Sequence, residues 1–203
     1  MKKAYPKTYS YLIECRKELE SRERRRFAGE EFYQYSRPQN FEVMQKPKIL
    51  VPAIADYAKY AIDERGEYFY VGSGGGGGGA HAILTNIEID QHYLLGLLNS
   101  RCLDKYLQII TTPFHSGWYA YSKGYIEQIP ILLPETGADQ KLAARIAESV
   151  KKILAAKAKL RSDVMTDRLR GTYESEIEHH ERRIDGDVFK LYGVDGLPNS
   201  AAH

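Results

Sequence analysis

Two segments of the chain bring together side chains that could contact a nucleic acid. Residues 34–40 read Gln-Tyr-Ser-Arg-Pro-Gln-Asn, and arginine, glutamine and asparagine are the residues that bind base edges through paired hydrogen bonds. Residues 111–123 mix hydroxyl groups, aromatic rings that could stack and a lysine. Both compositions are also typical of surface turns and of core aromatics, so composition alone leaves the two interpretations open.

A glycine-rich run at residues 72–79 suggests a phosphate or cofactor loop. A P-loop needs a lysine and a Ser/Thr that open a helix, but Ala80-His81 follows here and a strand resumes. The Gly-Ser-Gly after Val71 resembles the first motif of an S-adenosylmethionine pocket, although the helix required after that turn is absent. A catalytic methyltransferase fragment with such a pocket at residues 71–79 is therefore an alternative to a flexible or artificial linker.

Residues typical of catalysis or metal binding are scattered along the chain. His81, His92 and His115 lie far apart, and no Gly-x-Ser-x-Gly motif is present. The pair at residues 179–180 lacks HExxH spacing, which favours a solvated helix face over a metal site. Residues 139–141 imitate the end of a nuclease motif but fit a helix start better. We expect no catalytic, cofactor-binding or metal-binding residue in this chain.

The net charge of +2 hides blocks of opposite sign. The 29 Lys and Arg residues nearly cancel the 27 Asp and Glu residues. Residues 1–60 carry 13 basic and 8 acidic side chains, residues 61–140 carry 4 and 9, and residues 141–203 carry 12 and 10. Because salt screens each charge over roughly 8–10 Å, a basic block can attract a polyanion whatever the total charge is.

Composition also limits the class of protein. With 43% hydrophobic residues the chain can bury a core. No window approaches 18 consecutive apolar residues, and no apolar stretch follows the lysines of residues 1–7, so neither a membrane span nor a secretory signal is expected. Cys15 and Cys102 offer no disulfide framework. We expect a soluble, cytoplasmic protein with no membrane contact.

Periodicity predicts an N-terminal helix over residues 5–27, with Pro6 in its first turn. The helix ends in the run Arg-Glu-Arg-Arg-Arg at residues 22–26, before Gly29. Cations at a helix C-terminus favour the helix dipole, and the same cations could contact phosphates. The sequence leaves both interpretations of the arginine run open.

The middle of the chain predicts short strands and one long helix. Pro47 and Pro52 flank a strand and suggest a sheet margin, and Asp90 is expected to cap the helix. The expected elements are a strand at 49–51, a hairpin of 59–62 with 67–71, a strand at 82–85, a helix over 91–110, an aromatic strand at 118–121 and a helical turn at 123–128.

A boundary is expected at Pro134. Beyond it, apolar residues recur at helical spacing over 142–160 and again over 173–191, where the spacing is close to a heptad. The first helix is basic and the second acidic, so an antiparallel pair would place opposite charges side by side. We therefore predict an α+β fold, a mixed sheet of short strands with packed helices, followed by an antiparallel helical hairpin. The predicted domains are 1–134 and 135–203.

The order of several short motifs resembles the TaqI-like specificity domain, the C-terminal part of type IIG and related (Eco57I-like) restriction-modification methyltransferases. The resemblance covers about residues 5–134. The tail, with VFKLYG at 188–193, is similar to the helical ending of these proteins. The motifs are YPKTYSYL at 5–12, LESR at 19–22, FYQYSRP at 32–38, KPKILVP at 46–52, LLGLLNS at 94–100, GWYAYSK at 117–123 and IEQIPI at 126–131.

The resemblance implies a target-recognition domain for double-stranded DNA, without chemistry of its own. The whole enzyme would methylate adenine N6 with S-adenosylmethionine, and would use Mg²⁺ if it also cleaves DNA. The methyltransferase part would lie upstream or in a partner chain, so the sequence is interpreted as an excised or stand-alone fragment. The C-terminal helices would set the position of the domain or form a homodimer. A helical interaction protein that does not bind DNA is a competing hypothesis.

The residues expected to face DNA divide into two groups. Arg37, Lys48 and Lys123 would contact phosphates or guanine edges. The others would line a DNA-facing cleft, and they are His81, Thr112, Ser116, Trp118, Tyr119 and Tyr121.

Overall fold

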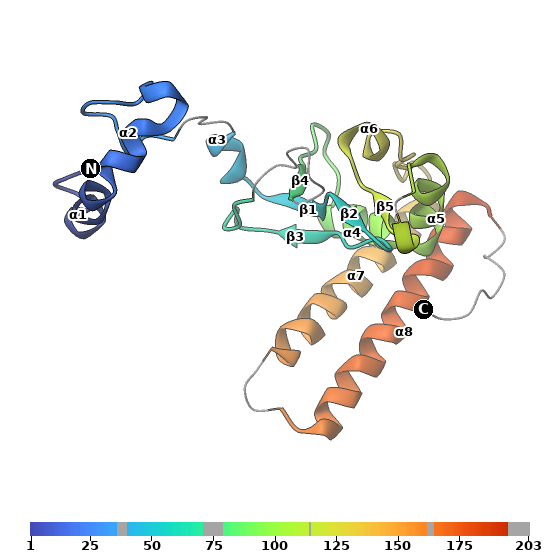
Figure 1. Cartoon of the computed structure of the whole chain (residues 1–203). Helices are drawn as coiled ribbons and strands as arrows, with labels where there is room; N and C mark the ends of the chain where they lie inside the picture. Colours follow the sequence, from blue (N-terminus) through green and yellow to red (C-terminus); the bar gives the residue numbers. More distant parts are fainter. Residues whose placement is uncertain (36–39, 71–78, 114, 162–164, 195–203) are drawn as a thin grey trace. The chain divides into compact units, whose positions relative to one another are not determined.

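The computed structural model describes residues 1–35, 40–70, 79–113, 115–161 and 165–194. The chain divides into two compact units, residues 1–43 and residues 44–203 (Figure 1). Each unit has its own internal contacts and is described by itself.

The first unit contains two short helices in place of the single helix predicted over residues 5–27. Helix α1 (Pro6–Glu14) begins at a proline, as expected, and α2 (Arg16–Arg25) follows after a break at Cys15. A second break occurs inside α2, where Arg22 leaves the helical region with φ −60° and ψ 151°. The continuous helix was therefore a wrong prediction. Helix α3 (Phe41–Met44) begins in this unit and ends with the first residue of the second unit.

An aromatic cluster holds the first unit together. Phe32 is 1% exposed, and its ring contacts those of Tyr9 and Tyr33 edge-on, at centroid distances of 6.5 and 5.3 Å. The Arg16 guanidinium covers the Phe32 ring at 4.8 Å. The segment after α2 folds back and supplies Phe32 and Tyr33 to this small core.

The second unit is built on a sheet whose described strands have the order β3-β1-β4, all antiparallel. These are β1 (Lys48–Pro52), β3 (Ala61–Asp63) and β4 (Ala80–Ile83). Strand β1 is central, so the sheet margin predicted from its prolines was wrong. Pro52 is the last residue of β1 and Pro47 lies outside it, which leaves the N–H groups of the strand interior free to pair. The predicted α+β class, with short strands and C-terminal helices, is confirmed, and the described strands pair antiparallel where a mixed sheet was expected.

The predicted hairpin of residues 59–62 with 67–71 is not formed by the described residues. Strand β3 pairs with β1 instead, and no strand is present at residues 67–70. Asp63 explains the difference, because its two carboxylate oxygens accept the N–H groups of Glu67 and Tyr68, each at 3.0 Å. A side chain thus captures the donors that a second hairpin strand would have needed.

A buried ion pair links β1 to β3. The Lys48 ammonium lies 2.5 Å from Asp63 Oδ2, and the two side chains are 0% and 2% exposed. Lys48 also donates to the Met44 carbonyl oxygen. Burial alone would raise the pKa of Asp63, but the bonds from Lys48, Tyr68 and Glu67 lower it to about 2. Asp63 is therefore fully ionised at neutral pH.

Ala53 joins this sheet to a second pair of strands. Its N–H donates to the Gly79 carbonyl oxygen at 3.0 Å, and its own carbonyl oxygen accepts the Tyr121 N–H at 2.9 Å. Just beyond it, β2 (Ile54–Ala55) pairs antiparallel with β5 (Tyr119–Ala120). The course of β1 therefore determines where the aromatic segment around β5 lies.

The long helix predicted over residues 91–110 is two helices. Asp90 caps α4 (Gln91–Asn99) as predicted, by accepting the backbone N–H groups of the first turn. Ser100 then leaves the helical region, and its hydroxyl caps α5 (Arg101–Ile110) through the Leu103 N–H. A short 3-10 turn η1 (His115–Gly117) and α6 (Lys123–Ile126) follow, the latter where a helical turn was expected.

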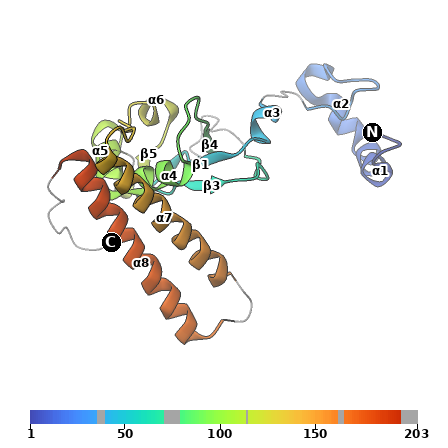
Figure 2. The same cartoon turned by 180° about the vertical axis from the view of Figure 1, so that it is seen from behind.

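Two long helices form the predicted antiparallel hairpin (Figure 2). Helix α7 (Gly137–Leu160) begins with a capping box between Thr136 and Asp139, which confirms a helix start where a nuclease motif was the alternative. Helix α8 (Asp167–Tyr192) ends at Gly193 in the left-handed conformation. The predicted charge complementarity is confirmed by ion pairs Arg145–Asp187 at 2.8 Å and Lys157–Glu181 at 4.0 Å.

The hairpin also corrects one expectation about its histidines. His179 is exposed, but His180 is only 6% exposed, so the pair does not form a solvated face. Burial, and next the neighbouring His179, lower the pKa of His180, which favours the neutral ring at neutral pH.

The hairpin shares one continuous apolar core with the sheet and with α4. Gly96 of α4 lies so close to α7 that a Cβ atom there would be 2.4 Å from Ile146 Cγ2 and 3.1 Å from Val150 Cγ2. The contacts place residues 44–134 and 135–203 in the same compact unit. The predicted domain boundary at residues 134/135 stays a prediction.

Polar contacts tie the end of α8 to the segment that leads into the hairpin. The Tyr192 hydroxyl donates to the Pro130 carbonyl oxygen at 2.6 Å and accepts the Leu132 N–H at 3.2 Å. The Tyr93 hydroxyl of α4 donates to the Leu132 carbonyl oxygen at 2.8 Å. No helix of the described residues is long and apolar enough to cross a membrane.

Replacing Gly96 should show how tightly α4 and α7 pack. Gly96→Ala is expected to lower the free energy of unfolding by about 1–3 kcal/mol, because the new methyl group overlaps stiff, β-branched side chains. Gly171→Ala in α8 is the matched control. A methyl group at Gly171 would have no atom within 4 Å, so the better helix propensity of alanine should raise stability by up to about 1 kcal/mol. Urea unfolding measures both, and equal effects would contradict the close contact.

The buried ion pair makes a prediction about acid stability. The Asp63 pKa is depressed in the folded state, so its contribution is complete above the unfolded pKa of about 3.9 and is lost as pH falls through about 2. Asp63→Asn should cost about 2–4 kcal/mol at neutral pH, and the gap to the wild type should narrow between about pH 4 and pH 2.

Urea unfolding over a pH series measures this gap. Glu67→Gln, which removes an exposed ion pair with Arg65, is the control and should change stability very little. A gap that stays constant down to pH 2 would contradict the assignment to Asp63.

Candidate nucleic-acid interface

The described residues of the segment 111–120, which are 111–113 and 115–120, belong to a loop that ends in β5. The Thr111 hydroxyl donates to the Ala120 carbonyl oxygen at 2.5 Å, and the Ala120 N–H donates to the Thr112 carbonyl oxygen at 3.4 Å. Ser116 and Gly117 at the turn have φ values of 63° and 78°. This backbone closes the loop and leaves the following tryptophan at its edge.

An exposed group of one cation and two aromatic rings lies beside this loop. The Lys59 ammonium is 4.3 Å from the Tyr57 ring centroid and 5.8 Å from that of Trp118. Tyr57 is 52% exposed and Trp118 is 42% exposed. We call Tyr57, Lys59 and Trp118 the cation–aromatic cluster.

Strand pairing brings the cluster together. Ala55 of β2 lies opposite Tyr119 of β5, so the residues that follow β2 meet the residue that precedes β5. Lys59 also forms an exposed ion pair with Asp56 at 2.5 Å, which raises the pKa of Lys59 and keeps its charge. A charged ammonium framed by two partly exposed rings can contact a phosphate or a base.

A buried tyrosine anchors β5 from the inner side. Tyr121 is 0% exposed, its ring contacts Tyr60 edge-on at 6.0 Å, and its hydroxyl donates to Asp104 Oδ1 at 2.7 Å. Burial raises the pKa of Asp104, although the bond from Tyr121 opposes the shift. The strand is thus fixed to α5 while Trp118 stays at the surface.

The structure removes two residues from the predicted interface. Lys48 is buried in its ion pair with Asp63, and Tyr121 is buried against Asp104, so neither can contact DNA in this fold. Sequence alone did not reveal that their polar groups have internal partners. Arg37 lies outside the described residues.

Four of the remaining predicted residues lie within the loop and β5. Thr112 and Ser116 are exposed, and the Thr112 hydroxyl bonds to the Tyr125 hydroxyl at 2.7 Å. Tyr119 is half-buried in β5 and Trp118 belongs to the cluster. Thr112, Ser116 and Trp118 are thus exposed in one segment, whereas the Tyr119 side chain packs partly against the apolar core.

The other two predicted residues come from separate elements. Lys123, at the start of α6, is 79% exposed and lies 3.5 Å from Glu127. His81 is half-buried in β4, where it lies opposite Val51. Whether either belongs to the same interface stays a prediction.

Sequence reasoning missed Tyr57 and Lys59. The available signal was an aromatic residue and a cation two positions apart, a spacing that places both side chains on one side of an extended segment. Their partner Trp118 is distant in sequence, and only the β2–β5 pairing makes the three residues neighbours.

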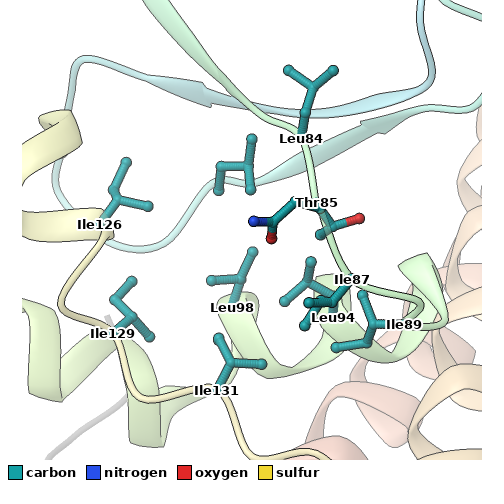
Figure 3. A pocket seen from close by; sticks show the side chains of 11 residues that line it. Leu84, Thr85, Ile87, Ile89, Leu94, Leu98, Ile126, Ile129 and Ile131 are labelled. Carbon is teal, nitrogen blue, oxygen red and sulfur yellow. The ribbon is translucent and has the colours of Figure 1, made fainter.

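An apolar pocket lies elsewhere in this unit, between the segment after β4, α4 and residues 126–131 (Figure 3). It has a volume of about 180 Å³, and it is lined by aliphatic side chains such as Leu94, Leu98 and Ile129. Thr85 and Asn86 are its polar residues, and no titratable side chain lines it. Among the residues that the structure describes, the pocket thus offers no titratable group for acid–base chemistry.

The described residues do not fit the alternative of an S-adenosylmethionine pocket. That pocket needs a helix directly after the glycine run, but Gly79 is followed by β4 at Ala80. The run itself, Val71 to Gly78, lies outside the described residues. In the part of the chain that the structure describes, no group of three or more His, Cys, Asp or Glu residues could hold a metal ion.

Removing the Tyr121 hydroxyl should weaken the anchor of β5. Tyr121→Phe is expected to cost about 1–3 kcal/mol at pH 7, because the bond to Asp104 is lost in a buried place. The same bond lowers the Asp104 pKa, so its loss raises that already elevated pKa further. The deficit should therefore shrink as the pH falls, because protonation of Asp104 removes the charged partner that the Tyr121 hydroxyl has in the wild type.

Urea unfolding over a series from pH 7 to acid pH checks this expectation. Tyr125→Phe, which removes a hydroxyl with no carboxylate partner, is the control and should show no such dependence on pH. An equal cost of Tyr121→Phe across the pH series would contradict a charged Asp104 as its partner.

Comparison with known proteins agrees with the resemblance found in the sequence. The family model of the TaqI-like C-terminal specificity domain matches residues 3–131. No curated protein matches the chain significantly. Because the match covers more than half of the sequence, the chain belongs to the TaqI-like C-terminal specificity domain family, the DNA-recognition domains of restriction-modification enzymes.

Proposed function

We propose that this chain is the target-recognition domain of a restriction-modification enzyme that methylates adenine N6 in double-stranded DNA. The chain binds DNA and performs no chemistry itself. Family membership supports DNA recognition, and the exposed cation–aromatic cluster is the observation in the structure that carries the proposal.

The cluster suits DNA contact through a few placed groups. Lys59 supplies a charge for a phosphate or a guanine edge, and Trp118 and Tyr57 supply apolar faces for sugars and bases. The exposed hydroxyl residues Thr112 and Ser116 lie in the adjoining loop and add hydrogen-bonding groups. Because the cluster contains one cation, the isolated domain binds DNA weakly. The catalytic part of the enzyme adds further contacts and raises the affinity.

The catalytic part is proposed to lie in another segment of the polypeptide or in a partner subunit. S-adenosylmethionine, and Mg²⁺ if the enzyme also cleaves DNA, would bind there. The strand that directly follows Gly79 supports placing the cofactor outside this chain. Such an enzyme would act in the cytoplasm.

The helical hairpin is proposed to orient the recognition surface against the catalytic part, or to pair two copies. The contacts of Tyr192 with Pro130 and Leu132 support a fixed orientation. The competing function, a helical interaction protein that does not bind DNA, has no support from the family match.

Fluorescence anisotropy with a labelled 30-base-pair duplex tests this function. The affinity of the wild-type chain should fall steeply with added salt. Lys59→Gln should reduce the slope of log affinity against log salt by about 0.9, the loss of one phosphate contact. Trp118→Ala should weaken binding by roughly 1 kcal/mol or more.

The control is Tyr68→Ala, which removes another exposed aromatic ring, 59% exposed, away from the cluster. Its affinity should match the wild type. A wild-type chain that does not bind duplex DNA would overturn the proposed function, and equal losses in all three variants would remove the cluster as the contact surface.

A further inference from the structure

The arginine run at residues 22–26 forms an unusual turn in the first unit. After Arg22 leaves the helix, Glu23 and Arg24 have φ,ψ of 47°,44° and 57°,41°, and Arg25 has φ 66°. Three successive residues other than glycine thus adopt the left-handed conformation, which L-residues rarely visit even singly. Strain of this kind persists where the surroundings hold it, and it often marks a functional segment.

Arg22 supplies the force that holds the turn. Its guanidinium donates to three backbone carbonyl oxygens, those of Leu19 at 2.9 Å, Phe32 at 2.8 Å and Gln34 at 2.9 Å. Arg22 therefore has an internal, structural role. It folds the chain back onto the segment that contains the buried Phe32.

The other three arginines have no such role. Arg24, Arg25 and Arg26 are exposed, and the ion pairs of the described residues do not include them. Glu20, whose ion-pair partner is Arg16, is close enough for Arg25 to add to the effect of Arg16 in lowering the Glu20 pKa. Arg26 lies near the Phe27 ring, at 5.8 Å. The sequence left open that these cations complement a helix dipole. Regular helical geometry ends before Arg22, so the arginines do not follow an uninterrupted helix C-terminus, and this interpretation fails.

We propose that Arg24, Arg25 and Arg26, the arginine turn, bind the phosphate backbone of DNA. This rests on the proposed function and adds a second contact surface, separate from the cation–aromatic cluster, on the first unit. Planar guanidinium groups bind phosphate oxygens through two hydrogen bonds, which suits arginine better than lysine for this task. The strained backbone presents three guanidinium groups on consecutive residues.

A nucleic acid fits this surface better than an acidic protein does. DNA carries a negative charge about every 1.7 Å along its axis, so three adjacent cations can all find partners on one strand region. An acidic protein segment offers separated carboxylates with less regular spacing. Family membership also places DNA in reach of this chain.

The arginine turn gives affinity without sequence information. Phosphate contacts fix the position of a protein on DNA, whereas contacts to base edges carry specificity. The first unit would therefore contribute the same affinity for every DNA sequence. The cluster on the second unit, with one cation, would be left to discriminate between sequences.

The variant Arg24→Gly/Arg25→Gly tests the proposal in the full chain. Glycine adopts positive φ without strain, so the thermal midpoint should stay unchanged or rise, and a loss of binding cannot be ascribed to unfolding. Anisotropy with a random 30-base-pair duplex should show a salt slope reduced by about 1–2, and an affinity at least tenfold lower at 50 mM salt.

A control with the same change in charge is Arg168→Gln/Arg170→Gln on α8, where both side chains are exposed. Its slope should equal that of the wild type if the effect is local to the arginine turn. Arg26→Gln is a second variant at a residue with helical φ, and its slope should fall by about 0.9.

The outcomes separate this proposal from the proposed function. If wild-type chain and duplex do not bind, the proposed function fails. A second outcome is that the wild-type chain binds the duplex and Lys59→Gln lowers the salt slope, but both arginine-turn variants keep the wild-type slope. This outcome would overturn the proposal for the arginine turn and leave the proposed function standing. Polyglutamate is the second probe, and variants that lose polyglutamate binding but keep the DNA salt slope would assign the turn to an acidic protein and overturn the proposal.

Discussion

The ion pair of Lys48 with Asp63 is the interaction on which the second unit depends. It fixes the register of β1 against β3, and the same carboxylate captures the N–H groups that end the turn after β3. The central strand β1 then continues through Ala53, which bonds to both sheets. The position of β5, and of Trp118 beside it, follows from this chain of contacts. A charged pair buried at one end of the sheet thus sets the geometry of a surface at the other.

One short aromatic segment both anchors and presents the candidate interface. Along residues 118–121 the side chains alternate, so Tyr121 lies in the core while Trp118 reaches the surface. The motif GWYAYSK therefore contains one aromatic residue that packs in the core and one that is exposed at the candidate interface. The inner tyrosine bonds to Asp104, and the outer tryptophan approaches Lys59. Resemblance to a family identifies such a motif as important without showing which of its rings is accessible.

Local patterns predicted much of the fold, and long-range contacts decided the rest. Helical spacing identified α7 and α8, and Asp90 identified the start of α4, because periodicity and capping are properties of nearby residues. The partner of β3 was mispredicted because a side chain removed the donors of the expected hairpin. Long-range contacts also explain why only part of the candidate site was predicted. The loop residues were visible in the sequence, whereas Tyr57 and Lys59 become neighbours of Trp118 only through strand pairing.

The hydrogen bonds of Tyr192 bear on how such a domain could change its specificity over time. Because the Tyr192 hydroxyl donates to the Pro130 carbonyl oxygen, a recombination junction after residue 131, where the family match ends, would separate two groups that bond to each other. The apolar core crosses the same junction. The sheet and the helical hairpin are therefore best exchanged between enzymes as one inherited block. New recognition would then evolve by substitution in exposed loops, with the block that carries them left intact.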